Sequence, residues 1–166
     1  MDLQSALEEL TSFDHRASAL LRRDHEVILA AFRQYREAAP SDASPRGAIA
    51  QRIGALLELH DRVEHSVVYP ALAPYYAPLI RAFLTEHEQI NECIAVLRET
   101  DNDAPAIAST LDRFERLARD HIAQEEVSLL AAVEREQPGL NARLYTAIVQ
   151  EKERLTGAIE DLESRS

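Results

Sequence analysis

Four segments of the chain carry an apolar stripe at three- and four-residue spacing, and in each segment a histidine lies in the middle of the stripe. This spacing is typical of an α-helix that is buried along one face. Turn-forming residues separate the segments at 40–45, 70–78, 101–105 and 137–139. A fifth stripe, at 144–162, has no metal-binding side chain on its inner face. The sequence therefore predicts four long helices and a fifth that packs outside them.

Short connections make consecutive helices antiparallel neighbours, which favours an up-and-down four-helix bundle. We expect one all-α domain over residues 1–166, with a core bundle at about 16–136, an additional C-terminal helix at about 138–164 and a short N-terminal helix. The absence of Trp and the presence of only four Gly agree with a helical chain. Counting residues from the predicted turns puts His25, His60 and His87 at one height, whereas the count for His121 differs by roughly one helical turn.

The charge and hydropathy of the chain exclude several classes of partner. A net charge of -11 argues against binding nucleic acid, because phosphate contacts need a basic surface. The apolar stretch 67–80 is interrupted by three prolines, and the first fifteen residues lack the basic region of a secretory signal. We therefore expect a cytoplasmic protein that binds neither nucleic acid nor membranes. Cys93 is the only cysteine, and we expect it to be a small core residue.

Two pairs of residues share a spacing that suits metal binding. His60 and Glu64 are four residues apart, as are His121 and Glu125, so each pair lies on one helical face. Imidazole and carboxylate ligands without thiolate suit iron, manganese or zinc. Six such ligands exceed the needs of one tetrahedral zinc, so a dinuclear site bridged by the glutamates is the better fit. The predicted ligands are His25, His60, Glu64, His87, His121 and Glu125.

In order and spacing, these motifs resemble those of the hemerythrin-like proteins, which carry the HHE cation-binding domain. The resemblance covers roughly residues 16–136 and rests on Asp24-His25, on His60-x-x-x-Glu64 with Val68-Tyr69-Pro70, on Glu86-His87 and on His121-x-x-x-Glu125-Glu126. It implies a diiron centre in a four-helix bundle, held by the six predicted ligands, with zinc or manganese as possible substitutes. It further implies a reaction with dioxygen, nitric oxide or hydrogen peroxide.

Five further residues bear on the function expected for the metal site and on its surroundings. Oxygen-carrying hemerythrins have a fifth histidine one turn after the third-helix histidine, and this chain has Asn91 there, so we do not expect a dedicated oxygen carrier. His65 stands where many relatives have Glu, and we expect it at the shoulder of the site or in contact with a ligand, with an additional metal ligand as the alternative. Tyr35 and Tyr69 are expected to pack in the core. The alternative is that their phenols lie near the open metal positions, where they would hydrogen-bond a bound oxygen species or be oxidised by it. His15 is expected to be solvated and without a role.

Three functions remain open from the sequence. The leading hypothesis is a diiron protein that binds or turns over dioxygen, nitric oxide or peroxide, as an enzyme or otherwise. The second is a sensing module in which the metal changes helix packing and thereby the contact with a protein partner at an acidic surface. The third is a metal-free helical interaction domain whose histidines are structural.

Overall fold

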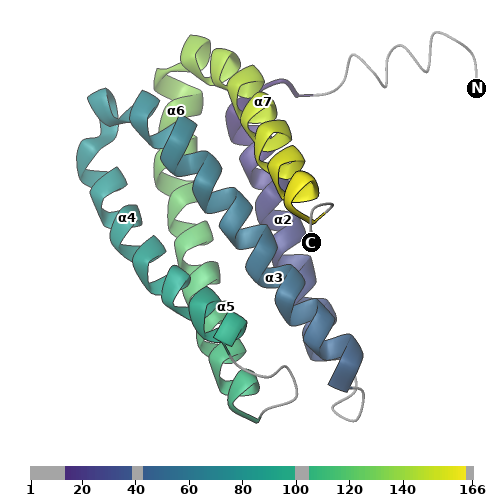
Figure 1. The fold of residues 1–166 in the computed structure, drawn as a ribbon. Helices are drawn as coiled ribbons and strands as arrows, with labels where there is room; N and C mark the ends of the chain where they lie inside the picture. The colour runs from purple at the N-terminus through teal and green to yellow at the C-terminus, as the bar shows by residue number, and fades with distance from the viewer. Residues whose placement is uncertain (1–13, 39–42, 100–104, 164–166) are drawn as a thin grey trace, which may run out of the picture.

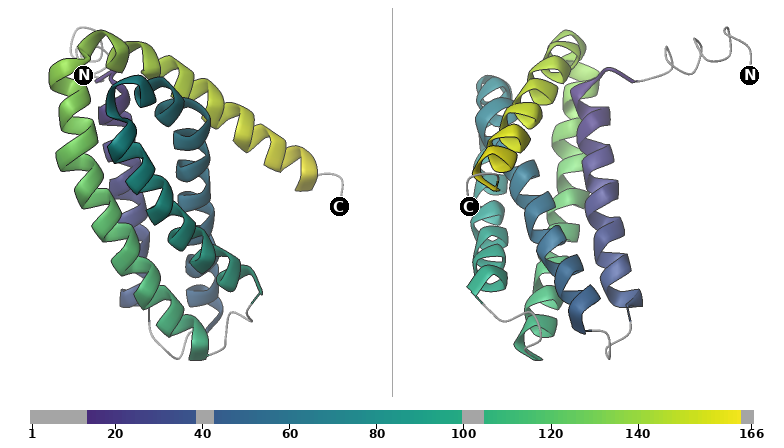
Figure 2. Two further views of the ribbon diagram at one scale, coloured as in Figure 1. Left: turned by 90° about the vertical axis from the view of Figure 1, so that its left-hand side faces the viewer. Right: turned by 45° about the vertical axis from the view of Figure 1, so that its right-hand side comes forward.

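Most of the structure is a bundle of four long helices (Figure 1). The computed structural model describes residues 14–38, 43–99 and 105–163. Consecutive helices run antiparallel, and α2 and α5 contact each other to close the bundle (Figure 2). This confirms the predicted all-α four-helix bundle, while the expected N-terminal helix lies outside the described residues. The bundle helices are α2 (Ala17–Glu37), α3 (Ala43–Val63), α4 (Tyr69–Glu99) and α5 (Pro105–Glu125).

Two short π-helical segments begin at or directly after the glutamates of the two His-x-x-x-Glu motifs. The first, η1 (Glu64–Val68), joins α3 to α4, and the second, η2 (Glu126–Leu130), joins α5 to the short helix α6 (Ala131–Glu136). At the end of η1 the backbone N–H of Tyr69 bonds to the carbonyl oxygen of Glu64, five residues back. π turns are wider than α turns and are frequent at functional sites. Their presence at both motifs therefore indicates that both motifs belong to a functional site.

The chain does not break at the first proline of the predicted turn at 70–78. Helix continues through Pro70, and the backbone leaves helical geometry only at Tyr76, where φ is -131° and ψ is 29°. Pro70 has no N–H to donate and its ring needs room beside the preceding turn. The wide π turn of η1 precedes Pro70 and provides room for the proline ring, which explains why the helix continues there. The prediction that the helical break starts at Pro70 was therefore wrong.

The last helix, α7 (Pro138–Glu163), folds back over the bundle and contacts α2, α3 and η1. It begins at a proline, whose missing N–H has no helical partner to lose in the first turn. Leu144, Ile148 and Leu155 are buried beneath it, as the predicted fifth stripe requires. The helix therefore packs outside the four-helix core, as predicted.

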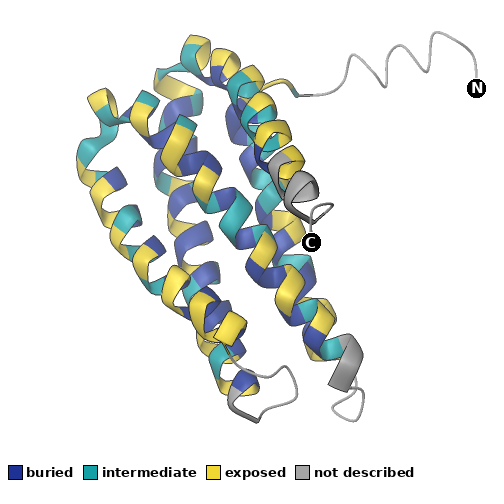
Figure 3. Ribbon diagram, viewed as in Figure 1, coloured by how far each residue is buried: buried dark blue, intermediate teal, exposed yellow. Residues whose placement is uncertain are grey.

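The buried residues lie on the helix faces that point into the bundle (Figure 3). They form two apolar clusters with a polar layer between them. On α2, His25 is flanked by Leu21 of one cluster and Ile28 of the other, and on α4 His87 lies between Phe83 and Ile90 in the same way. Apolar packing on both sides removes water from the layer, so polar groups inside it must find partners there. None of the described helices is both long and apolar enough to cross a membrane.

Candidate metal centre

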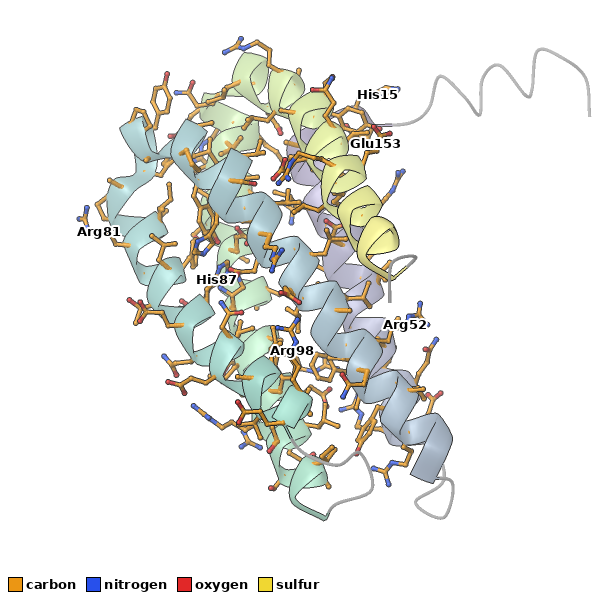
Figure 4. All side chains as sticks on the ribbon, in the orientation of Figure 1. His15, Arg52, Arg81, His87, Arg98 and Glu153 are labelled. Carbon is orange, nitrogen blue, oxygen red and sulfur yellow. The ribbon has the colours of Figure 1, made fainter. Side chains whose placement is uncertain are left out.

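Four histidines, one from each bundle helix, meet in the polar layer. Their side chains are almost completely buried, with 1–3 % of each residue exposed. The Nε2 atoms of His25 and His60 lie 3.2 Å apart, and those of His87 and His121 lie 2.9 Å apart. In Figure 4 His87 lies inside the bundle, whereas Arg81 of the same helix points away from it.

His121 is level with the other three histidines, although residue counting left it one turn away. The start of α5 projects beyond the end of α4 at the bottom of the bundle (Figure 1). That overhang accounts for the additional turn of α5 between the connection and His121. The count assumed that both helices end at the same height, and the structure corrects this assumption.

The carboxylates of Glu64 and Glu125 are fully buried between the imidazoles. Glu64 reaches both halves of the site, because its Oε1 lies 3.3 Å from His60 Nε2 and its Oε2 lies 3.3 Å from His87 Nε2. Glu125 Oε2 lies 3.2 Å from His25 Nε2. Neither Glu64 Oε1 nor Glu125 Oε2 has a hydrogen-bond partner. Buried acceptor atoms without a partner are costly, and a cation at this position would satisfy both.

The donor atoms fall into two groups, each close enough to hold one metal ion. One group contains His25, His60, Glu64 and Glu125, and the other contains Glu64, His87 and His121. Within each group all donor atoms lie within 4.8 Å of one another. Glu64 belongs to both groups, as a ligand shared between two ions would. The structure thus brings all six predicted residues together around one centre.

The protonation of the site is set by burial and by the two carboxylates. Burial lowers the pKa of His121 to about 3 and also lowers the pKa of His60, so both imidazoles are neutral. Burial acts in the same direction on His25, but its contacts with Glu125 and Glu126 together outweigh burial and raise its pKa. Burial, reinforced by the charge of Glu125, raises the pKa of Glu64 well above its usual range. Glu125 is shifted the other way, because its contact with His25 outweighs burial and lowers its pKa strongly.

Each of the four histidines also has a carboxylate at its Nδ1 atom, on the side away from the centre. Glu126 Oε1 lies 2.9 Å from His25, Glu86 Oε2 lies 2.8 Å from His121, and Asp24 Oδ2 lies 3.5 Å from His60. Asp61 is in close contact with His87. Such carboxylates favour the tautomer with the proton on Nδ1 and leave Nε2 free to bind a metal.

These outer carboxylates link the helices into a closed ring. Asp24 of α2 contacts the histidine of α3, Asp61 of α3 contacts that of α4, and Glu86 of α4 contacts that of α5. Glu126, which follows α5, contacts the histidine of α2 and closes the ring. No role was predicted for these acids, although Asp24, Glu86 and Glu126 are part of the motifs that carry the family resemblance. Each of the four directly precedes or follows a ligand residue in the sequence, which is the signal that could have identified them.

The remaining residues singled out in the sequence take different places. The Tyr69 hydroxyl donates a hydrogen bond to Glu64 Oε2 at 3.1 Å and lies 3.4 Å from His87 Nε2, so this buried phenol belongs to the centre. Tyr35 and Cys93 are buried in the apolar cluster away from it. His15 is exposed, with its ring against the edge of Tyr145. The last member of this set, His65, lies beside His87.

Lys152 connects α7 to the outer carboxylates of the centre. Lys152 Nζ lies 2.5 Å from both carboxylate oxygens of Asp24, the acid behind His60. Beside this ion pair is a cavity of about 70 Å³, with apolar walls that include Ile28 and Leu56. His60 also lines the cavity, and its Nδ1 atom is buried without a hydrogen-bond partner.

Comparison with known proteins gives consistent results. Residues 16–133 match the sequence pattern of the hemerythrin HHE cation-binding domain. The uncharacterised proteins Rv2633c of Mycobacterium tuberculosis and Mb2666c of Mycobacterium bovis are 27% identical over 113 residues, which is 68% of this chain and 69% of each relative. The crystal structure of an HHE cation-binding domain-containing protein, the Rv2633c homologue of Mycobacterium kansasii, superposes with a TM-score of 0.74 at 24% identity. That match covers 86% of this chain and 88% of the other, and it supports the same fold.

Proposed function

The chain belongs to the hemerythrin HHE cation-binding family, and from this we propose that it holds two iron ions and reacts with dioxygen, nitric oxide or hydrogen peroxide. The observation that carries the proposal is the division of the six donors into two groups that share Glu64. Six nitrogen- and oxygen-donor residues exceed what one tetrahedral zinc needs, and a shared carboxylate is the usual bridge in a dinuclear site. Iron favours such mixed imidazole and carboxylate ligands.

The proposed roles follow from the contacts of each side chain. His25, His60, His87 and His121 would be ligands through Nε2, and Glu64, which belongs to both donor groups, would be shared between the two ions. Glu125 belongs to the group of His25 and His60, and we propose it as a second shared ligand from the resemblance to the family. When bound, the two irons supply the electrons for reduction of a small oxidant or the open positions for a diatomic ligand. Two carboxylates do not neutralise two divalent ions, so anionic ligands are favoured at the open positions.

Tyr69 is the protein group best placed to act on a bound ligand. Burial, together with the carboxylate of Glu64, raises the pKa of its phenol far above the usual value, so the hydroxyl keeps its proton. That proton is available for a hydrogen bond to Glu64, and the hydroxyl oxygen also lies 3.5 Å from Glu125 Oε1. A bound ligand would compete with Glu64 for this single proton, so Tyr69 would donate its hydrogen bond either to Glu64 or to the ligand.

The position of Asn91 argues for reactivity over reversible oxygen carriage. Its side-chain amide donates a hydrogen bond to Asp61 Oδ2 at 3.1 Å, outside the ligand groups. A fifth histidine ligand from this helix position is therefore not available in this chain. Each donor group keeps two histidines, and a metal held there would retain positions for a small ligand.

The test is the metal content and reactivity of protein expressed in iron-replete cells. We expect about two irons per chain, near-ultraviolet absorption that is lost on reduction, and spectral changes when the reduced protein meets nitric oxide, dioxygen or peroxide. Repeated additions of peroxide distinguish turnover from stoichiometric binding. Iron-free protein, or protein with a single zinc, would contradict the proposal.

One observation favours sensing as a second candidate. Lys152 connects α7 to the carboxylate behind His60, so a change at the centre has a direct route to the outermost helix. In this version, loss of the metal would alter the packing of α7 and hence its contact with a protein partner. Hydrogen exchange of α7 in metal-loaded and chelated protein tests this, and identical protection in both states would eliminate it.

A further inference from the structure

Three donor atoms converge on the solvent side of His87, outside the centre described above. His65 Nε2 lies 3.1 Å from Asp61 Oδ1 and 3.2 Å from His87 Nδ1, and Asp61 Oδ1 is in close contact with the same His87 nitrogen. The rings of His65 and His87 are nearly parallel, 19° apart, with centroids at 5.3 Å. The side chain of His65 is 42% exposed, so this cluster can be reached from solvent.

The two separations from His65 match those between ligands of one metal ion, whereas Asp61 and His87 lie closer together and would have to move apart around a cation. Zinc and iron bind imidazole nitrogen and carboxylate oxygen at about 2.0–2.2 Å, which puts neighbouring ligand atoms roughly 3.0–3.5 Å apart. The two distances from His65 fall in that range. Two histidines and one carboxylate on one side, with open positions on the other, form a donor set that binds divalent iron and zinc.

Asp61 is oriented for this role by Asn91. The Asn91 amide donates to Oδ2, which leaves Oδ1 turned toward the two rings. Asp61 Oδ1 is buried and has no hydrogen bond of good geometry, a condition that it shares with Glu64 Oε1 and Glu125 Oε2 at the inner centre. A cation bound between this oxygen and the two imidazole nitrogens would be a better partner for it than the poorly aligned histidine contacts.

The two halves of the bundle differ at this corner. Glu126, the residue after Glu125, contacts His25 and forms an ion pair with Arg22 at 3.2 Å. His65, the residue after Glu64, occupies the corresponding place beside His87. Thus one half has an acid neutralised by a fixed arginine, and the other half has an imidazole.

Among the described residues, Asp61 contacts two histidines and one asparagine: His65, His87 and Asn91. The nearest groove, between η1 and α7, contains Arg62 and Arg154, but these arginines are paired with Glu58 and Glu151. This corner therefore combines the carboxylate of Asp61, two imidazoles and access to solvent, which are the features that a cation site needs.

We propose that Asp61, His65 and the Nδ1 atom of His87 form a third divalent-cation site, on the solvent side of the dinuclear centre. The site rests on the proposed function through His87, whose Nε2 atom faces the inner metals. A cation at Nδ1 replaces the proton on that nitrogen, and the proton leaves to solvent. His87 then bridges the outer cation and the inner centre, while His65 and Asp61 complete the attachment.

The test is the number of Co²⁺ ions that the full-length, metal-free protein binds in an anaerobic titration. We expect about three ions per chain for the native sequence, the third weaker than the others, and about two for His65→Ala. His15→Ala is the matched control, because His15 is exposed and its ring contacts Tyr145 away from the centre; it should keep the third ion. Circular dichroism verifies that both variants are folded.

The outcomes separate this proposal from the proposed function. About two ions in both the native protein and His65→Ala overturn the third site and leave the dinuclear centre standing. Fewer than two ions in the native protein contradict the dinuclear centre itself. Anomalous diffraction from a cobalt-loaded crystal gives a second, independent readout: density between His65 and His87 supports the site, and its absence at saturating cobalt overturns it.

Discussion

Ser18 and Asn141 are 123 residues apart and exchange two buried hydrogen bonds. The backbone N–H of Ser18 donates to Asn141 Oδ1, and Asn141 Nδ2 donates to Ser18 Oγ, both at 2.9 Å. Asn141 is completely buried and Ser18 is almost so, and the bonded groups of both residues therefore cannot form hydrogen bonds to water in place of these two. This pair fixes the first turn of α7 against the first turn of α2.

Replacing Asn141 by Ala leaves two buried polar groups of Ser18 without partners. We expect the free energy of unfolding to fall by about 1–3 kcal/mol, because unpaired buried groups bear their full desolvation cost. Urea denaturation measures the change. Gln150→Ala is the matched control, since this amide lies exposed on the same helix and its loss should change stability by less than about 0.5 kcal/mol. Equal effects for the two variants would contradict the role of the pair.

Replacing Lys152 by Met removes the positive charge next to Asp24. A nearby cation disfavours the more positive, oxidised metal centre, so its loss should lower the reduction potential of the iron-loaded protein by on the order of tens of millivolts. Spectroelectrochemistry measures the shift. Arg154→Met, on the same helix but paired with the surface residue Glu151, should leave the potential unchanged. If the reduction potential of Lys152→Met equals that of Arg154→Met and of the native protein, the charge of Lys152 does not act on the centre.

Replacing Glu125 by Gln keeps the shape of the side chain and removes its charge. We expect the protein to lose at least one of its two metal ions, because Glu125 belongs to a donor group of the centre and its Oε2 atom has no other partner. Elemental analysis of the purified protein measures the stoichiometry. Glu136→Gln makes the same charge change at an exposed position on the helical run that follows Glu125 and should retain both ions.

Replacing Glu86 by Gln tests the ring of outer carboxylates. Glu86 contacts the Nδ1 atom of His121, and loss of such an outer partner weakens metal binding by roughly 10- to 100-fold. Competition with a chelator measures the affinity. Glu88→Gln, an exposed residue of the same helix, is the control and should leave the affinity unchanged. If both variants bind metal like the native protein, the ring is structural only.

The metal-free protein should lose stability as the pH falls below about 6.5. The pKa of His121 is about 3 in the folded state, and that of His60 is also lowered, so in this range the unfolded chain binds more protons. The free energy of unfolding therefore rises with pH there. Glu64, whose pKa is raised, acts in the opposite direction and partly offsets the effect. Urea denaturation at several pH values in the presence of a chelator measures the slope, and a flat profile between pH 4 and about 6.5 would contradict it.

The sequence predicted the inner donors better than their surroundings. Spacing along one helix determines which side chains share a face, so His60 with Glu64 and His121 with Glu125 could be paired by counting. Contacts between helices depend on rotation and height, which counting does not supply. The outer carboxylates and the link from Lys152 to Asp24 belong to this second class. Tyr69 was predicted to be buried, but the contact of its hydroxyl with Glu64 depends on the π turn between them.

The π turns after the two motifs have a consequence for any attempt to transplant the centre. A straight α-helix with histidine and glutamate four residues apart would reproduce the ligands and lose the wide turn, so every later side chain would point in a different direction. Deleting one residue from η1, such as Ser66, would restore regular helix and swing the Tyr69 hydroxyl away from Glu64. A π turn holds the equivalent of one additional residue, and this residue sets the direction in which the side chains after each glutamate point around the helix axis. A design that transfers the ligands to another helix would therefore have to include the additional residue as well.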